Sequence, residues 1–220
     1  MQLETAATIV NEFQRGALTT RIAALEHLFQ GVTRRRARSL CLREDLDPAL
    51  LEAAFKLKTV AGQINVIIHA AGILTALPSL LGTSEKVSSL SLGAGNTGRS
   101  FDLETDQRIA EFKFIRWRGG SETIRQNSVF KDFFALAEAR TKKERYLYVL
   151  GVERPLKFLR GRRQLKSVMS KNAGLASEFE RRYGSRFRVV REYYEYRKNR
   201  VQIVDLLPIV PELGELPETD

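Results

Sequence analysis

Residues 100–117, SFDLETDQRIAEFKFIRW, hold the pattern that most limits what this chain can fold into. Apolar and polar residues alternate over 101–105 and again over 108–117, which predicts two β-strands. Asp106 and Gln107 stand between the two runs and form the expected turn. Because a lone hairpin is marginally stable in water, the pattern also predicts a larger sheet around it.

The register of this hairpin decides which side chains meet across it. A turn centred between residues 106 and 107 pairs residues whose numbers sum to 213. Asp102, Glu111 and Lys113 then share one sheet face, because successive side chains alternate between faces. The opposite, apolar face would consist of Phe101, Leu103, Ala110, Phe112 and Phe114.

Two carboxylates directly opposite each other, roughly 5 Å apart, destabilise a sheet unless something compensates their charge. A hard divalent cation does so, and Mg²⁺ prefers carboxylate oxygens together with several waters. Asp102 and Glu111 are therefore the predicted metal ligands, with the Phe112 carbonyl as a further oxygen and Mn²⁺ as a substitute ion. Lys113 projects beside Glu111, where it would position a water or stabilise charge on an attacked phosphate.

An Asp followed by Glu-x-Lys on a hairpin resembles the catalytic signature of the PD-(D/E)XK nuclease superfamily, although Phe101 stands where that signature has proline. The element order over residues 50–150, helix, strand, hairpin, helix, strand, is similar to the superfamily core. The resemblance implies an α/β, restriction endonuclease-like fold with a mixed central β-sheet flanked by helices. It also implies Mg²⁺-dependent hydrolysis of phosphodiester bonds, as in an endodeoxyribonuclease. In the exonuclease branch a glutamine precedes a tyrosine by four residues, and Gln126 with Phe130 occupies that place, so Gln126 is a candidate catalytic residue.

The positive charge of the chain is concentrated in residues 151–200, with 15 Lys and Arg against 5 Glu, while the other 170 residues hold 21 of each sign. Such a block favours a polyanionic partner, most often nucleic acid, and a solvated basic surface is the plainer alternative. We expect DNA as the partner, with RNA open. The candidate phosphate contacts are Arg125, Lys157, Arg160, Arg162, Arg163, Lys166 and Lys171.

Residues 59–84 contain no charged residue, which raises the question of a membrane span. Polar residues, the interior glycines Gly62 and Gly72, and Pro78 argue instead for a buried helix that covers one sheet face, without stable membrane association. Within it, His69 is expected to be a hydrogen-bonded core residue. Asp47 and Pro48 predict the N-cap and first position of the preceding helix.

The remaining elements complete one α/β domain. We predict a helix over 5–30 with a weak point at Gly16, and further helices over 121–139 and 175–183. Strands are expected over 86–92, 145–152, 186–196 and 201–210. The predicted division is an N-terminal helical segment packed on the core (1–48), a nuclease-like domain (49–210) and an acidic, disordered tail (211–220).

Other functions remain open. Gly93–Gly98 match G-x-G-x-x-G, but a strand-like run follows where a nucleotide-binding site needs a helix, so a nucleotide- or methyl-donor-binding enzyme is one alternative. A non-catalytic nucleic-acid-binding protein on the same fold is another. A single cysteine, Cys41, and an N-terminus without a secretory pattern favour the cytoplasm. The oligomeric state is also open, and a homodimer could cut two strands.

Overall fold

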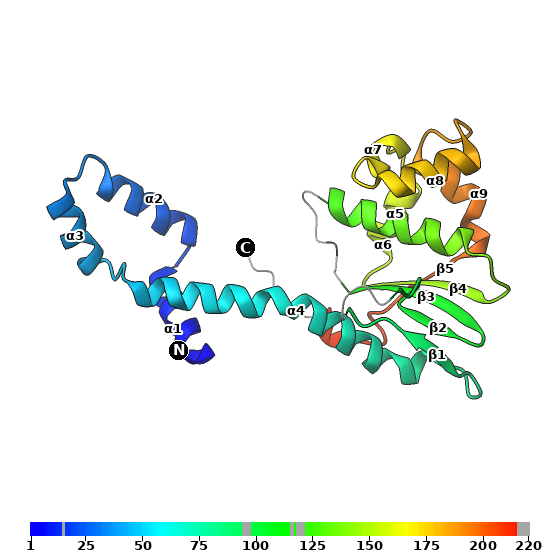
Figure 1. Cartoon of the computed structure of the whole chain (residues 1–220), viewed down its shortest axis with the longest axis horizontal. Coiled ribbons are helices and arrows are strands. Elements are labelled where there is room, and N and C mark those ends of the chain that lie inside the picture. Colours follow the sequence, from blue (N-terminus) through cyan, green and yellow to red (C-terminus); the bar gives the residue numbers. More distant parts are fainter. Residues whose placement is uncertain (15, 94–97, 115–116, 118–121, 215–220) are drawn as a thin grey trace. The chain divides into compact units, whose positions relative to one another are not determined.

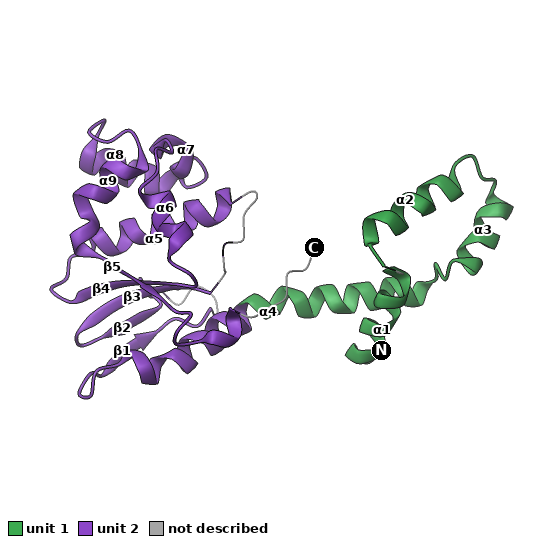
Figure 2. Ribbon diagram, turned by 180° about the vertical axis from the view of Figure 1, so that it is seen from behind, with its two compact units in different colours: residues 1–65 green, residues 66–220 purple. Residues whose placement is uncertain are grey.

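The computed structural model describes residues 1–14, 16–93, 98–114, 117 and 122–214 (Figure 1). The chain divides into two compact units, residues 1–65 and 66–220 (Figure 2). The predicted boundary after residue 48 falls at the start of a long helix, α4, and the two units divide within that helix. The elements are α1 (Leu3–Gln14), α2 (Leu18–Phe29), α3 (Arg34–Arg43), α4 (Pro48–Leu80), β1 (Val87–Leu90), β2 (Leu103–Thr105), β3 (Arg108–Lys113), α5 (Thr123–Glu138), β4 (Glu144–Val149), α6 (Glu153–Leu159), α7 (Leu165–Met169), α8 (Ala173–Tyr183), α9 (Val190–Arg197), η1 (Lys198–Arg200), β5 (Gln202–Asp205) and η2 (Pro211–Leu213).

The first unit is helical, and its predicted single helix over 5–30 is wrong. The chain breaks at Gly16, where φ is +105°, a conformation that glycine adopts at little cost, so α1 and α2 are separate helices. An ion pair joins α2 to the end of α3, with Arg21 Nη1 2.8 Å from Glu44 Oε2.

Helix α4 begins as the sequence predicts. Asp47 Oδ1 accepts a hydrogen bond from the Leu50 N–H at 2.9 Å, and Pro48 is the first helical residue. In the part of the chain that the structure describes, α4 alone is long and apolar enough to cross a membrane, yet only 17% of its most apolar window is buried. The prediction of a buried helix is therefore correct only for the C-terminal turns, where Ile73 and Ala76 are fully buried.

The second unit contains a five-stranded mixed sheet in the order β1-β2-β3-β4-β5. The first three strands are antiparallel neighbours, whereas β3, β4 and β5 pair in parallel. The predicted α/β class with a mixed central sheet flanked by helices is confirmed.

The hairpin register is also confirmed, because Leu103 pairs with Ala110 and Glu104 with Ile109, and both sums are 213. The strands are shorter than predicted, since β2 begins only at Leu103 and β3 ends at Lys113. Residues 101 and 102 bend, so the alternation of faces stops there. As a result Phe101 packs on the opposite side of the sheet from the other predicted members of the apolar face, and its predicted placement is wrong.

Each sheet face has its own hydrophobic core. Helices α5 to α9 cover the face that carries Ile109, Leu147 and Val149, while the C-terminal part of α4 covers the face of Ala110 and Phe112 (Figure 1). Glu111 and Lys113 alternate with the second group and therefore face the α5 side. The sheet thus presents the predicted charged residues to a layer of helices.

Residues 186–196 do not form the predicted strand. Val190, Tyr193 and Tyr194 are buried at helical spacing in α9, and Glu192 Oε2 accepts hydrogen bonds from the N–H groups of Arg188 and Val189 before the helix. In the tail, Pro211–Leu213 form the short helix η2 instead of the predicted disorder, because Leu213 packs on the core. Residues 215–220 lie outside the described residues.

Candidate active site

Asp102 lies in the bend immediately before β2 and makes two contacts. Its Oδ2 accepts a hydrogen bond from the Phe112 N–H at 2.9 Å, and its Oδ1 lies 3.3 Å from His69 Nε2. Burial by itself raises the pKa of Asp102, but His69, the Phe112 N–H and the Lys113 charge outweigh it and hold the pKa below its usual value. Asp102 is therefore a carboxylate at neutral pH.

Glu111, in the middle of β3, behaves in the opposite way. Burial raises its pKa, and the negative charges of Asp132 and Asp102 raise it further, to about 9. A side-chain hydrogen bond with Asp102 acts in the same direction. Glu111 thus keeps a proton at neutral pH, and this proton relieves the repulsion that the hairpin register creates between the two carboxyl groups.

Lys113 forms an ion pair with an acid that the sequence analysis did not identify. Its Nζ lies 2.6 Å from Oδ2 of Asp132 in α5, whose side chain is only 6% exposed. Burial alone would lower the pKa of Lys113, yet Asp132, Glu111 and Asp102 raise it. Burial also raises the pKa of Asp132 against the effect of Lys113, but the short distance favours the charged pair.

A sequence signal for Asp132 did exist. It stands three residues after Val129 and four before Leu136, both of which are buried in α5, so it lies on the apolar stripe of this helix. Charged residues are almost never buried without a partner, and an acid in this position indicates a buried cation nearby.

His69 was expected to be a core residue, and its role is more specific than that. Its ring stands edge-on to Phe114, with the centroids 6.0 Å apart, while its side chain stays 25% exposed beside Asp102. Phe114 in turn fills the space beside Gly72, one turn further along α4. The packing of α4 on the sheet therefore brings His69 to Asp102.

Gln126 does not take part in these contacts as far as the described residues show. Its Oε1 accepts a hydrogen bond from Arg163, one of the candidate phosphate contacts. Gln126 and Arg125 lie in the first turns of α5, and both are partly buried. The catalytic role of Gln126 stays a prediction.

The other candidate phosphate contacts are exposed on α6, α7 and the adjoining turns, and in the described part of the chain no acidic side chain forms an ion pair with them. They are Lys157, Arg160, Arg162, Lys166 and Lys171. Exposed cations without intramolecular partners are free to contact phosphates. Residues 94–97 of the predicted glycine loop lie outside the described residues.

The donor set fits a hard divalent cation with few protein ligands. Among the described residues no three His, Cys, Asp or Glu side chains form a ready-made metal cage. Mg²⁺, however, commonly binds through one or two carboxylates and keeps several waters. A hydrogen bond joins the protonated Glu111 to Asp102, and a divalent cation bound between them would take the place of this proton. The Phe112 carbonyl stays a predicted third oxygen ligand.

No protein-family model, curated protein or solved structure matches this chain.

Proposed function

We propose that the protein is a Mg²⁺-dependent nuclease that hydrolyses phosphodiester bonds of DNA, on a restriction endonuclease-like version of the mixed α/β fold. The observation that carries this proposal is the convergence of Glu111 and Lys113 of β3 with Asp102, in the bend before β2, and with Asp132 of α5. The spacing of Asp102, Glu111 and Lys113 resembles the PD-(D/E)XK signature, although Phe101 stands where that signature has proline.

The acidic and basic residues of the site would have different roles in the reaction. Asp102 and Glu111 would hold Mg²⁺, which supplies a Lewis acid and a means to lower the pKa of a bound water. His69 borders Asp102 and limits the positions that its carboxylate can take. The ion pair with Asp132 keeps Lys113 protonated, so the ammonium can donate hydrogen bonds to the attacking water or to a phosphate oxygen.

The exposed cations supply affinity for the substrate. Lys157, Arg160, Arg162, Lys166 and Lys171 would contact backbone phosphates, which carry no sequence information. Binding should therefore weaken steeply with salt. The logarithm of the binding constant should fall by roughly one unit per phosphate contact for each tenfold rise in salt concentration.

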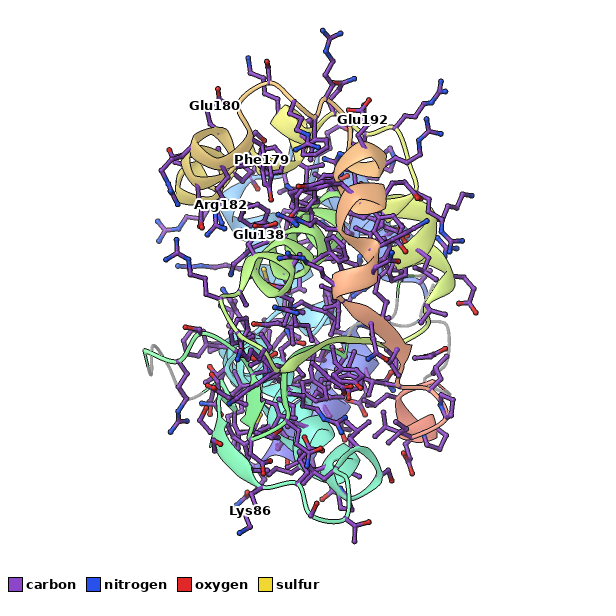
Figure 3. The ribbon with its side chains drawn as sticks, turned by 90° about the vertical axis from the view of Figure 1, so that its right-hand side faces the viewer. Lys86, Glu138, Phe179, Glu180, Arg182 and Glu192 are labelled. Atoms are coloured by element: carbon purple, nitrogen blue, oxygen red, sulfur yellow. The ribbon has the colours of Figure 1, made fainter. Side chains whose placement is uncertain are left out.

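A cleavage assay on plasmid, linear and single-stranded DNA, with Mg²⁺, Mn²⁺ or a chelator, tests the proposal. Glu111→Ala and Lys113→Ala should abolish Mg²⁺-dependent nicking and leave DNA binding largely intact. Lys86→Ala is the matched control, because Lys86 points into solvent at the start of β1 (Figure 3), and it should cut like the wild type. Equal cleavage by the wild type and the Lys113→Ala variant would contradict the proposed nuclease function.

Two other functions make different predictions in the same assay. A non-catalytic nucleic-acid-binding protein on this fold would bind DNA and never cut it, with any metal. A nucleotide- or methyl-donor-binding enzyme would tolerate Lys113→Ala and fail with Gly95→Val.

A further inference from the structure

A groove lies between α7, α8 and the segment 184–188, away from the charged residues of the candidate active site. Its volume is about 830 Å³, within the range of small-molecule and nucleotide pockets. Its apolar lining comes from Leu165, Met169, Phe179 and Phe187. Phe179 is 2% exposed and turns inward from α8, whereas its neighbour Glu180 lies at the outer side (Figure 3).

The rim of the groove carries positive charge. Lys166 and Arg188 line it and are exposed, and in the described residues neither side chain forms an ion pair. Lys171 lies two residues after the end of α7 and is exposed as well. Glu180 is the acid among the lining residues, so cations outnumber acids at this rim.

Aromatic and cationic groups also stack beside the groove. Phe187 is only partly buried, and its ring packs against Tyr183 and Tyr196 with centroids 5.4 and 5.3 Å apart. The Arg186 guanidinium lies 5.1 Å from the Phe187 ring centroid and 4.4 Å from that of Tyr196. A partly exposed, rigidly held ring next to cations is the combination on which bases of single strands stack.

We propose that this groove binds an unpaired nucleotide of single-stranded DNA. The base would lie on the apolar floor beside Phe187, while Lys166 and Arg188 contact the flanking phosphates. This inference rests on the proposed function in one respect, the choice of DNA as the polyanion. An apolar peptide could use the same floor, but it would gain nothing from the cations at the rim, and the excess positive charge of this region therefore favours the nucleotide.

The groove can be filled without touching the candidate active site. Ser177 lines the groove from an exposed position on α8, so Ser177→Trp places a large ring inside it. Ser167 is an equally exposed serine on α7 that does not line the groove, which makes Ser167→Trp the matched control. Lys166→Ala removes one of the rim cations instead.

Binding of a labelled single strand of about 20 thymidines and of a duplex of the same length is measured by fluorescence anisotropy in EDTA. Ser177→Trp should weaken single-strand binding about tenfold, the effect of roughly one lost base stack, and leave duplex binding within about twofold. Ser167→Trp should change neither, and Lys166→Ala should weaken single-strand binding.

Because EDTA prevents cleavage, the two proposals fail separately. Loss of single-strand binding in Ser177→Trp from a protein that cuts no DNA supports the groove and contradicts the nuclease. Unchanged single-strand binding in Ser177→Trp contradicts the groove whether or not the protein cuts. A wild type that binds no single strand, or that binds an apolar peptide in this groove and no single strand, also overturns the inference.

Discussion

Asp102, Glu111 and Asp132 surround Lys113 with more negative charge than one ammonium can neutralise. Burial and this negative charge raise the pKa of Glu111 to about 9, so Glu111 keeps its proton at neutral pH. Such an arrangement stores electrostatic strain that a divalent cation could relieve. We therefore expect the stability of the protein to depend on the protonation of this site and on cations.

Glu111→Gln should change the pH dependence of stability. A raised folded-state pKa means that the folded chain holds the proton more tightly, so this contribution is present below about pH 4.5 and is lost as pH rises towards 9. Glutamine does not titrate. The variant should match the wild type at about pH 4 and exceed its free energy of unfolding by about 4–5 kcal/mol at about pH 8, measured by urea unfolding. A difference that stays constant with pH would contradict the burial of this carboxyl group.

Asp132→Asn should remove the partner of a buried ammonium. The free energy of unfolding should fall by about 3 kcal/mol, because Lys113 is left in the interior without its nearest acid. Replacing both residues, as Lys113→Met with Asp132→Leu, should recover most of the loss.

The control for this prediction is Glu104→Gln, which breaks the more exposed pair with Lys143 and should cost no more than about 1 kcal/mol. If Asp132→Asn costs as little as Glu104→Gln, the Lys113–Asp132 pair is not a buried one.

At the residue scale the sequence predicted that Glu111 and Lys113 share one face of β3, because this depends only on the alternation of a strand. It also placed Asp102 near Glu111 through the two-residue turn, although the contacts of Asp102 with the Phe112 N–H and His69 depend on the bend at residues 101–102. The sequence did not predict that Asp132 and His69 join the site, because each reaches it through the packing of a helix on the sheet. No local pattern says which sheet position a helix residue will meet.

At the scale of elements, the contact between α4 and the sheet sets the position of His69. Gly72 allows this contact, since a Cβ at this residue would lie 2.5 Å from Phe114 Cε1. Phe114 is buried and stacks on Phe112, so its ring has little room to move.

Two glycines of α4 therefore predict opposite outcomes for the same substitution. Gly62→Ala should stabilise the protein by up to about 1 kcal/mol, because alanine favours helix and nothing lies within 4 Å of the new Cβ. Gly72→Ala should destabilise it by about 1–3 kcal/mol through overpacking against Phe114. Thermal and urea unfolding of the two variants measure this directly, and a stabilising Gly72→Ala would show that α4 packs differently.

The central strands and α5 were predictable because their apolar patterns are strong and local. The helix α9 was not predictable, because Tyr193 and Tyr194 between arginines fit an alternating strand as well as a helix. The hydrogen bonds of Glu192 at the helix start are what distinguish the two. Gly16 and the bend at residues 101–102 likewise depend on backbone conformation, which alternation does not encode.

At the scale of the whole molecule, the acids of the candidate site and the excess of cations lie in different parts of the chain. The acids of the candidate site lie at the sheet and in α5, whereas the excess of cations lies on the helices that follow β4. The mixed sheet could be predicted from the order of elements. The division after residue 65 could not, because α4 continues through it as one helix without a break in the sequence pattern.

The central claim is that Asp102 and Glu111 bind a hard cation in place of the proton that they share. Isothermal titration of Mg²⁺, in buffers of different ionisation enthalpy near about pH 7.5, measures the protons released on binding. We predict release of about one proton from the wild type and none from Glu111→Gln. Magnesium binding without proton release, or equal release from both proteins, would contradict the account.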